Sequence, residues 1–119
     1  MELFNRVKIG KSMISLDKFK ESDIRLGTIV SAEKVEGADK LLKLMFDFGG
    51  PEPVQILSGI AEFYDPAVLV GKQVPVIVNL EPRTLKGQAS NGMMLAVVVD
   101  GKPVLLHPEK EVSPGSIVR

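Results

Sequence analysis

Side chains that commonly carry enzyme chemistry are sparse and scattered in this sequence. The 119 residues include no cysteine and one histidine, His107, so no thiolate metal site, histidine cluster or cysteine nucleophile can form. Four of the aspartates, Asp23, Asp39, Asp47 and Asp65, fall in four different turns or strand ends. No two of them have the spacing of an acid–base pair or of a shared metal site. We therefore expect a chain that is not an enzyme, with no metal site and no cofactor.

Cationic and amide side chains are instead concentrated in residues 79–93. The segment includes Asn79, Arg83, Lys86, Gln88, Ser90 and Asn91, and Met93 follows where the chain enters a predicted strand. Cations can bind phosphate, amides and hydroxyls can bond base edges or the ribose 2′-hydroxyl, and methionine can pack against a base. The segment is thus a candidate RNA-binding loop. A solvated loop whose glycines and proline only set its path is an equally good interpretation of the spacing.

Further cations extend this candidate surface. Lys40, with Lys34 and Lys43, could form a positive rim beside the loop, although a solvated surface position is the usual fate of a single lysine. Arg25 lies between two apolar residues of a predicted strand, where it could contact a ligand or pair with Asp23. Because aromatic residues make up only 5% of the chain, recognition of a folded RNA is favoured over stacking of a long single strand.

The net charge conceals an uneven distribution. Fifteen basic residues balance fifteen acidic ones, so the net charge is zero. Taken alone, a net charge of zero disfavours a nucleic-acid ligand, because phosphate binding is usually accompanied by an excess of basic residues. Residues 51–70 hold three acids and no base, however, whereas residues 71–102 hold four bases and two acids. We therefore expect modest RNA affinity with a shallow salt dependence, strengthened if two copies of the site act together.

Hydrophobic patterning predicts one small β domain. Strands are expected over residues 24–35, 41–48, 54–57, 74–80, 93–99, 104–106 and 117–118, and helical turns over 16–22, 60–64 and 66–69. Residues 81–92 are expected to form a loop, and Asp100-Gly101 a hairpin turn. This order fits an all-β chain with a short helix, namely a five-stranded Greek-key barrel of the OB-fold with N- and C-terminal extensions.

Three residues predict local geometry. Gly27, in the middle of the first strand, is expected to mark a bulge or a sharp bend. Pro75 is expected to begin the fourth strand or to place it at a sheet edge. Ser15 is expected to cap the first helical turn. The N-terminus has no long apolar run, which favours a cytoplasmic protein without a signal peptide or membrane span.

Six motifs, in order, resemble one family. They are Asp23-Ile24-Arg25-Leu26-Gly27-Thr28-Ile29, Ala38-Asp39-Lys40-Leu41, Ser58-Gly59-Ile60, Leu69-Val70-Gly71-Lys72, Asn79-Leu80-Glu81-Pro82-Arg83 and Gly87-Gln88-Ala89-Ser90-Asn91-Gly92-Met93. Together they resemble the tRNA-binding OB domain, over residues 14–119. That domain occurs at the C-terminus of many methionyl-tRNA synthetases, as their separate beta subunit, in endothelial monocyte-activating polypeptide and in free tRNA-binding dimers.

The resemblance implies a function and a site. It implies structure-specific, non-catalytic tRNA binding by a beta subunit or accessory domain of methionyl-tRNA synthetase, which would raise the local tRNA concentration. The tRNA-binding positions that it implies are Asn79, Arg83, Ser90 and Met93, with Lys86 and Lys40 as nearby basic positions. Two departures, the acidic Glu36 before Ala38 and Thr84 at a position that is often basic, weaken the match at those points.

The resemblance also implies an assembly and a domain division. It implies a homodimer, with the methionyl-tRNA synthetase catalytic subunit as a possible second partner besides tRNA. Residues 1–14 would form an N-terminal extension in the dimer contact, and residues 15–119 the tRNA-binding domain, including dimerisation strands at about residues 101–119. An alternative resemblance is to a secretion-associated chaperone of the same fold, which would bind polypeptides. A dimerisation domain with a vestigial groove is a third interpretation.

Overall fold

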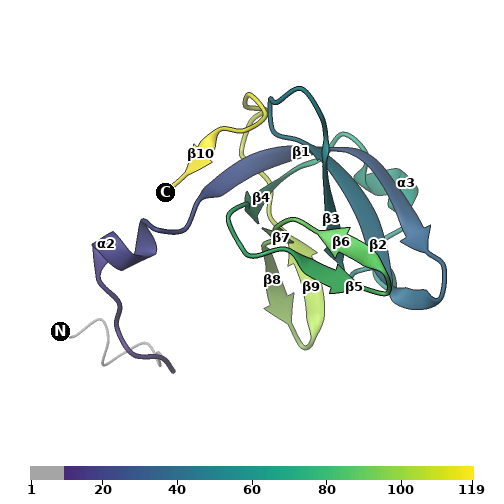
Figure 1. Ribbon diagram of the computed structural model, residues 1–119, viewed down its shortest axis with the longest axis horizontal. Helices are drawn as coiled ribbons and strands as arrows, with labels where there is room; N and C mark the ends of the chain where they lie inside the picture. The colour runs from purple at the N-terminus through teal and green to yellow at the C-terminus, as the bar shows by residue number, and fades with distance from the viewer. Residues whose placement is uncertain (1–9) are drawn as a thin grey trace.

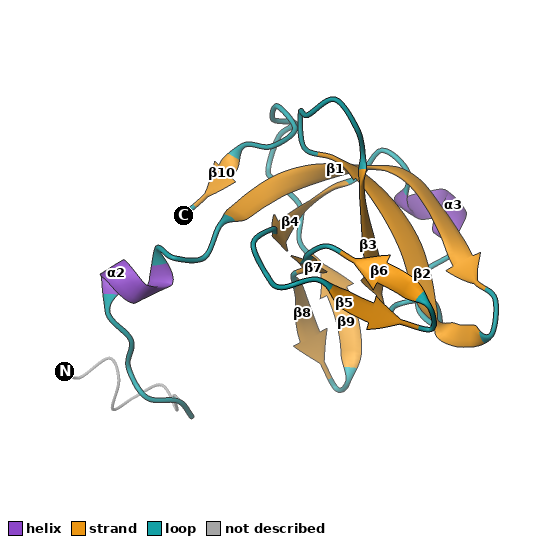
Figure 2. Ribbon diagram, viewed as in Figure 1, coloured by secondary structure: helices purple, strands orange, loops and turns teal. Residues whose placement is uncertain are grey.

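An antiparallel sheet forms the centre of the molecule in the computed structural model, which describes residues 10–119 (Figures 1 and 2). Its strands are β1 (Ile24–Val35), β2 (Ala38–Asp47), β3 (Val54–Ser58), β4 (Gln73–Ile77), β7 (Met93–Met94) and β10 (Ile117–Val118). The strand order is β3-β2-β1-β4-β7, and β10 pairs with the beginning of β1. The predicted mostly-β class is therefore confirmed.

Two separate hairpins and two short helices complete the fold. One hairpin pairs β5 (Arg83–Leu85) with β6 (Gln88–Ser90), and the other pairs β8 (Ala96–Val99) with β9 (Lys102–Leu105). The helices are α2 (Leu16–Phe19) and α3 (Pro66–Leu69). Within residues 10–119, no helix has the length and apolar character needed to cross a membrane.

The core follows from the period-two pattern of β2. Leu42, Leu44 and Phe46 are fully buried, whereas the alternating residues Lys43 and Met45 are only partly covered. Each fully buried side chain of this size contributes about 1.5 to 3 kcal/mol relative to an exposed one. The remaining buried apolar residues of the central cluster come from β1, β3, β4, α3, β7 and the turn after β3: Ile29, Ile56, Ile60, Leu69, Val74, Val76 and Met94.

The helical turns were predicted with partial success. Ser15 Oγ accepts a hydrogen bond from Lys18 N (3.0 Å), so the predicted cap of α2 is confirmed. Asp65 caps α3, where Pro66 occupies the first turn as expected. Residues 60–64, by contrast, form turns and not a helix. Both Phe63 N and Tyr64 N donate to Ile60 O, and the turn ends there because Asp65 has the extended backbone of a helix cap.

The bulge that was one of the two predicted roles of Gly27 is not found there, and the other, a sharp bend, stays a prediction. The irregularities of the β1–β2 register lie between Ile29 and Ser31 and between Lys34 and Val35. A Cβ atom at Gly27 would lie 2.6 Å from Phe48 Cε1 and 2.7 Å from Phe46 Cδ1. Those two rings stack on each other with centroids 5.6 Å apart. Glycine is therefore needed here because the aromatic rings pack directly onto the backbone of β1.

The prediction that Pro75 begins β4 or lies on an edge strand was wrong. Pro75 is the third residue of β4, and β4 lies between β1 and β7. The ladder with β7 pairs only Val76 and Ile77, beyond the proline. At Pro75 itself the carbonyl accepts a bond from Leu95 N (2.9 Å), and the ladder with β7 does not extend to this residue, which has no N–H to donate.

Residues 93–99 are not the single buried strand that their apolar character predicts. They divide into β7 and β8, and Val97, Val98 and Val99 are exposed. The reason is that β8 pairs with β9 in a sheet of its own, which projects from the core in Figure 1. The Asp100-Gly101 turn of this hairpin has the positive φ angles, 50° and 76°, that the sequence predicts.

Individual hydrogen bonds, and not a strand ladder, link β3 to the last residue of β6 and to the residue after it. Asn91 N donates to Gln55 O (3.0 Å), and Leu57 N donates to Ser90 Oγ (3.0 Å). Among the residues that the structure describes, no ladder pairs β3 with β7. The outermost strands of the sheet order, β3 and β7, are thus adjacent but are not paired along their length.

Candidate nucleic-acid interface

The β5–β6 hairpin carries two of the predicted cations. Residues 81–92 were predicted to be a loop, but Leu85 and Gln88 pair across a two-residue turn formed by Lys86 and Gly87. Both turn residues have positive φ, 51° and 77°, as in the tight turns that match the twist of paired strands. Lys86 therefore lies exposed at the tip, and the exposed Arg83 lies at the base of β5.

A small cleft brings together cations from β1, β2 and the β5–β6 turn. Its volume is about 140 Å³, and it is lined by Lys34, Val35, Glu36, Lys43, Lys86 and Gln88. We call this the cationic cleft. Lys34 and Lys86 are exposed, whereas Lys43 Nζ is paired with Glu33 Oε1 at 2.7 Å. Three ammonium groups around one opening can bind a phosphate, and Glu36 limits how positive the opening is.

Lys40 and Met93 lie outside this cluster. Lys40 is exposed on β2. Its carbonyl accepts a hydrogen bond from Ala61 N (3.1 Å), which belongs to the turn after β3. Met93 is 40% exposed and pairs with Ile77 across β4 and β7. Neither residue lines the cationic cleft.

Ser90 is a buried internal link. Only 1% of this residue is exposed. The hydroxyl accepts from Leu57 N (3.0 Å) and donates to Gly92 O (3.1 Å), so its hydrogen-bonding capacity is largely used within the protein. Ser90 therefore contributes to the interface through its internal hydrogen bonds, which hold the end of β6 against β3.

Asn79 joins the end of β4 to the segment before β1. Its Oδ1 accepts from Asp23 N (2.8 Å), and its Nδ2 donates to Glu21 O (2.7 Å). Val78 N also donates to Asp23 O (2.8 Å), so three hydrogen bonds hold this junction. The amide that the sequence predicts to bind RNA is thus engaged with the backbone.

Arg25 forms the ion pair that was one of its two predicted alternatives. Its Nε donates to Asp23 Oδ1 (2.8 Å), and a second guanidinium nitrogen donates to Gly115 O (3.2 Å). The hydrogen bond and the charge of Asp23 raise the pKa of Arg25 above its ordinary value. Arg25 consequently connects β1 to the chain that leads into β10.

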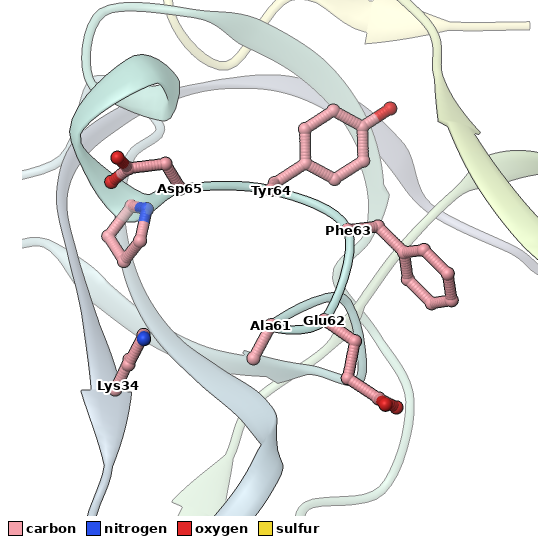
Figure 3. A pocket seen from close by; sticks show the side chains of 7 residues that line it. Lys34, Ala61, Glu62, Phe63, Tyr64 and Asp65 are labelled. Atoms are coloured by element: carbon pink, nitrogen blue, oxygen red, sulfur yellow. The ribbon is translucent and has the colours of Figure 1, made fainter.

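Larger clefts lie elsewhere on the surface, and two of them are lined in part by Arg25 or Lys34. One, of about 370 Å³, is lined by Asp23, Arg25, Phe48, Val54, Val78 and Asn91. The other, of about 340 Å³, is lined by Lys34 and residues 61–66. In Figure 3 the rings of Phe63 and Tyr64 point away from this second opening, and Tyr64 Oη donates to Pro103 O (3.2 Å). The Tyr64 hydroxyl thus links this turn to β9.

Gln55 is an interface residue that the sequence analysis missed. Its side-chain Nε2 donates to Ala89 O (2.9 Å) and to Gln88 Oε1 (3.3 Å), while its carbonyl accepts from Asn91 N. The available signal was a lone glutamine in the apolar strand Val54–Ser58, where a polar side chain needs a partner.

Lys34, Lys43 and Lys86 thus line one cleft. Arg83 and Met93 are exposed and lie within seven positions of Lys86 in the sequence. The structure places Asn79, Arg25 and Ser90 in internal hydrogen bonds. In the part of the chain from residue 10 onward, no group of three or more histidine, aspartate or glutamate side chains is arranged to hold a metal ion.

Comparison with known proteins assigns residues 24–117 to the family described as "Putative tRNA binding domain". Methionine–tRNA ligase of Methanothrix thermoacetophila is 49% identical over 109 residues, which cover 92% of this chain and 16% of that enzyme. The chain therefore spans only a small part of such curated relatives.

Solved structures share the fold over their whole length. The MetRS related protein from Pyrococcus horikoshii has a TM-score of 0.85 and 34% identity, over 92% of this chain and 100% of its own. The chaperone CsaA of Bacillus anthracis has a TM-score of 0.82 and 30% identity, over 91% of this chain and 100% of its own.

Proposed function

Because the chain belongs to the tRNA-binding domain family, we propose that it grips folded tRNA through phosphate contacts and performs no catalysis itself. The observation that carries this proposal is the convergence of Lys34, Lys43 and Lys86 at the cationic cleft. Cations from separate strands are fixed relative to one another, so they suit a ligand whose phosphates also have fixed positions. A folded tRNA has this property, and an unfolded strand does not.

Two exposed cations of the hairpin, together with Met93 of β7 and Lys40 of β2, extend the proposed contact surface. Arg83 and Lys86 contact phosphates, Met93 packs against a base or sugar, and Lys40 contacts a more distant phosphate. Asn79 and Arg25 shape the surface through their bonds to the backbone. With so few cations, the salt dependence is shallow, since each phosphate contact adds about 0.7 to 0.9 to the slope of log affinity against log salt.

The scaffold is proposed to be an OB-fold barrel. The hydrogen bonds from Asn91 N to Gln55 O and from Leu57 N to Ser90 Oγ support this, because they link the outer strand β3 to the segment that enters β7. Similarity to the solved MetRS related protein supports it further. OB-folds commonly bind nucleic acid beside the connection between their last two strands, where the β5–β6 hairpin lies in this chain.

The physiological partner is proposed to be a methionyl-tRNA synthetase. The relatives named methionine–tRNA ligase contain a matching segment within a much longer chain. A tRNA-binding domain linked to a catalytic domain raises the local concentration of tRNA at that domain. As a beta subunit or accessory domain, the chain would act in the cytoplasm, where tRNA is aminoacylated.

A homodimer is the proposed assembly. Support comes from an exposed apolar surface on the β8–β9 hairpin, which comprises Val97, Val98, Val99 and Val104 and is followed by Leu106. Met13 and Ile14 are exposed as well, at 79% and 61%. The predicted N-terminal contact over residues 1–14 lies mostly outside the described residues, since the description begins at residue 10. A dimer would bring two cationic clefts to one tRNA or to two.

Sedimentation with and without native tRNA tests the proposal. We expect the tRNA to sediment with the protein as a larger complex, at low salt and at protein concentrations in the micromolar range. If the tRNA sediments alone under these conditions, the proposed function is wrong.

Polypeptide binding is a second candidate function, favoured by the similarity to chaperone CsaA. The exposed valines of the β8–β9 hairpin could cover an apolar peptide segment as well as a second copy of the chain. A chemically unfolded client protein distinguishes the two. Suppressed aggregation of that client, together with no bound tRNA, would support the chaperone function and contradict tRNA binding.

A further inference from the structure

We propose that the side chains of Gln55 and Ser90 act together as positioning residues, which hold the β5–β6 hairpin against β3 and thereby fix Arg83 and Lys86 for tRNA. This inference rests on the proposed function. It assigns Ser90 no contact with RNA, and it gives Gln55 a role that the sequence motifs do not indicate.

The hairpin is attached to the main sheet by two side chains, Gln55 and Ser90, together with one backbone bond from Asn91 N to Gln55 O. In residues 10–119, β5 and β6 pair only with each other and share no ladder with another strand. A two-stranded hairpin alone is marginally stable in water, so its orientation must be set by other contacts. The hydrogen bonds from β3 provide those contacts.

Gln55 supplies the outer part of this attachment. Its Nε2 donates to Ala89 O (2.9 Å), a carbonyl of β6 that the short ladder leaves available, and to the side chain of Gln88 (3.3 Å). Gln88 in turn lines the cationic cleft with Lys86. A side chain on β3 is therefore connected in two steps to the cleft that would hold a phosphate.

Ser90 supplies the inner part. Its hydroxyl bridges Leu57 N and Gly92 O at 3.0 and 3.1 Å. Gly92 has a φ of +136°, and a Cβ there would lie 2.8 Å from Ile77 O, so the chain turns tightly against β4 at this point. The hydroxyl thus fixes both the end of β6 and the turn that leads into β7.

The cross-strand register transmits this attachment to the cations. Arg83 pairs directly with Ser90, and Leu85 pairs with Gln88 on the other side of the Lys86-Gly87 turn. If β6 moves away from β3, Arg83 and Lys86 must move with it. Loss of the attachment should consequently reduce the contributions of both cations to tRNA binding.

A double-mutant cycle tests this inference. Gln55→Met retains the length of the side chain and removes its hydrogen-bond donor. The affinity for labelled native tRNA is measured at several salt concentrations for Gln55→Met alone and for Gln55→Met combined with Arg83→Ala and Lys86→Ala. In the otherwise unaltered chain, we expect Gln55→Met to weaken binding about fivefold and to lower the salt slope. In the Arg83→Ala/Lys86→Ala background, the same substitution should weaken binding less than about twofold. Ser90→Ala should follow the same pattern.

Two results would overturn the inference without affecting the proposed function. One is an equal loss of affinity from Gln55→Met in both backgrounds, which would mean that Gln55 acts independently of the cations. The other is unchanged affinity of the Gln55→Met single variant. Val68→Met, which introduces the same residue at a 55% exposed position of α3 outside the proposed contact surface, is the matched control and should leave affinity unchanged. Absence of tRNA binding by the unaltered chain would instead contradict the proposed function itself.

The thermal unfolding midpoint of each variant separates positioning from general instability. Gln55 is only partly buried, so Gln55→Met should remain folded at the assay temperature. A loss of folded protein lowers the active fraction and leaves the salt slope unchanged. A reduced slope at an unchanged folded fraction is therefore specific to displacement of the cations.

Discussion

Arg83 and Ser90 are directly opposite each other in the β5–β6 hairpin, yet Arg83 is exposed and Ser90 is 1% exposed. Directly opposite residues share a face of a β ladder, so the difference arises from side-chain length and attachment. The short serine bonds the backbone of β3, while the long arginine extends into solvent. One pair of neighbours thus combines an internal link with a candidate phosphate contact.

Loss of either hairpin cation should weaken tRNA binding. Arg83→Ala or Lys86→Ala is expected to lower affinity by about three- to tenfold at low salt, and to reduce the salt slope by about one, because each removes one phosphate contact. Anisotropy titrations over a salt series give both quantities. Lys72→Ala serves as the control, since Lys72 is exposed but lies outside the cationic cleft. Unchanged binding in both hairpin variants would place the interface elsewhere.

Release of Lys43 from its ion pair should strengthen binding. Glu33→Gln removes the carboxylate that lies 2.7 Å from Lys43 Nζ. Since the glutamate side chain is 62% exposed, the pair contributes about 1 kcal/mol or less to stability. We expect the variant to remain folded and to bind tRNA about two- to fivefold more tightly. Weaker binding would show that Lys43 needs its partner to be correctly oriented.

Replacement of Gly27 should destabilise the fold. Gly27→Ala would place a methyl group 2.6 Å from the Phe48 ring and 2.7 Å from the Phe46 ring, so the free energy of unfolding should fall by about 1 to 3 kcal/mol. Denaturant titration measures this change. Gly50→Ala is the matched control, because a Cβ there would meet no other described atom within 4 Å. Equal stability of the two variants would mean that the rings move aside at little cost.

Asn79→Ala separates a structural role from an RNA contact. The variant loses bonds of 2.7 and 2.8 Å to the backbone of residues 21 and 23, and its free energy of unfolding should fall by about 1 to 3 kcal/mol. The salt slope and affinity of the folded fraction should stay close to those of the unaltered chain. A large loss of affinity at full stability would instead indicate that tRNA displaces these bonds and contacts Asn79 directly.

A charge on the β8–β9 hairpin should disrupt the proposed dimer. Val98 is 72% exposed, so Val98→Lys should leave the stability of the single chain almost unchanged while it introduces an unpaired charge at the contact. Sedimentation is expected to detect monomers. Val68→Lys, at a 55% exposed position of α3, should leave the dimer intact. If Val98→Lys also sediments as a dimer, another surface forms the contact.

Local patterns predicted the regular parts of this fold. The alternation of Leu42, Leu44 and Phe46 predicted the face of β2 that is buried, and Asp100-Gly101 predicted the second hairpin turn. The β5–β6 hairpin was missed because its turn, Lys86-Gly87, requires a positive φ at a lysine, which propensity alone disfavours. The exposure of β8 depends on which strand it pairs with, and apolar composition carries no such information.

Residue type predicted the candidate site better than it predicted the role of each residue. The segment 79–93 was identified by its cations and amides. Of the three lysines expected beside it, Lys34 and Lys43 line one cleft with Lys86, whereas Lys40 does not. Internal hydrogen bonds of Asn79, Arg25 and Ser90 depend on partners 56, 90 and 33 positions away in the chain. Such partners become visible only once the fold is known.

The central claim is that this chain recognises folded tRNA through cations held in fixed positions. Anisotropy titration at low salt, with one tRNA in its native form and in a chemically unfolded form of equal length and charge, tests that claim most directly. The proposal predicts saturable binding of the native form and clearly weaker binding of the unfolded form. Equal affinity for the two forms, or no binding of either, would contradict it.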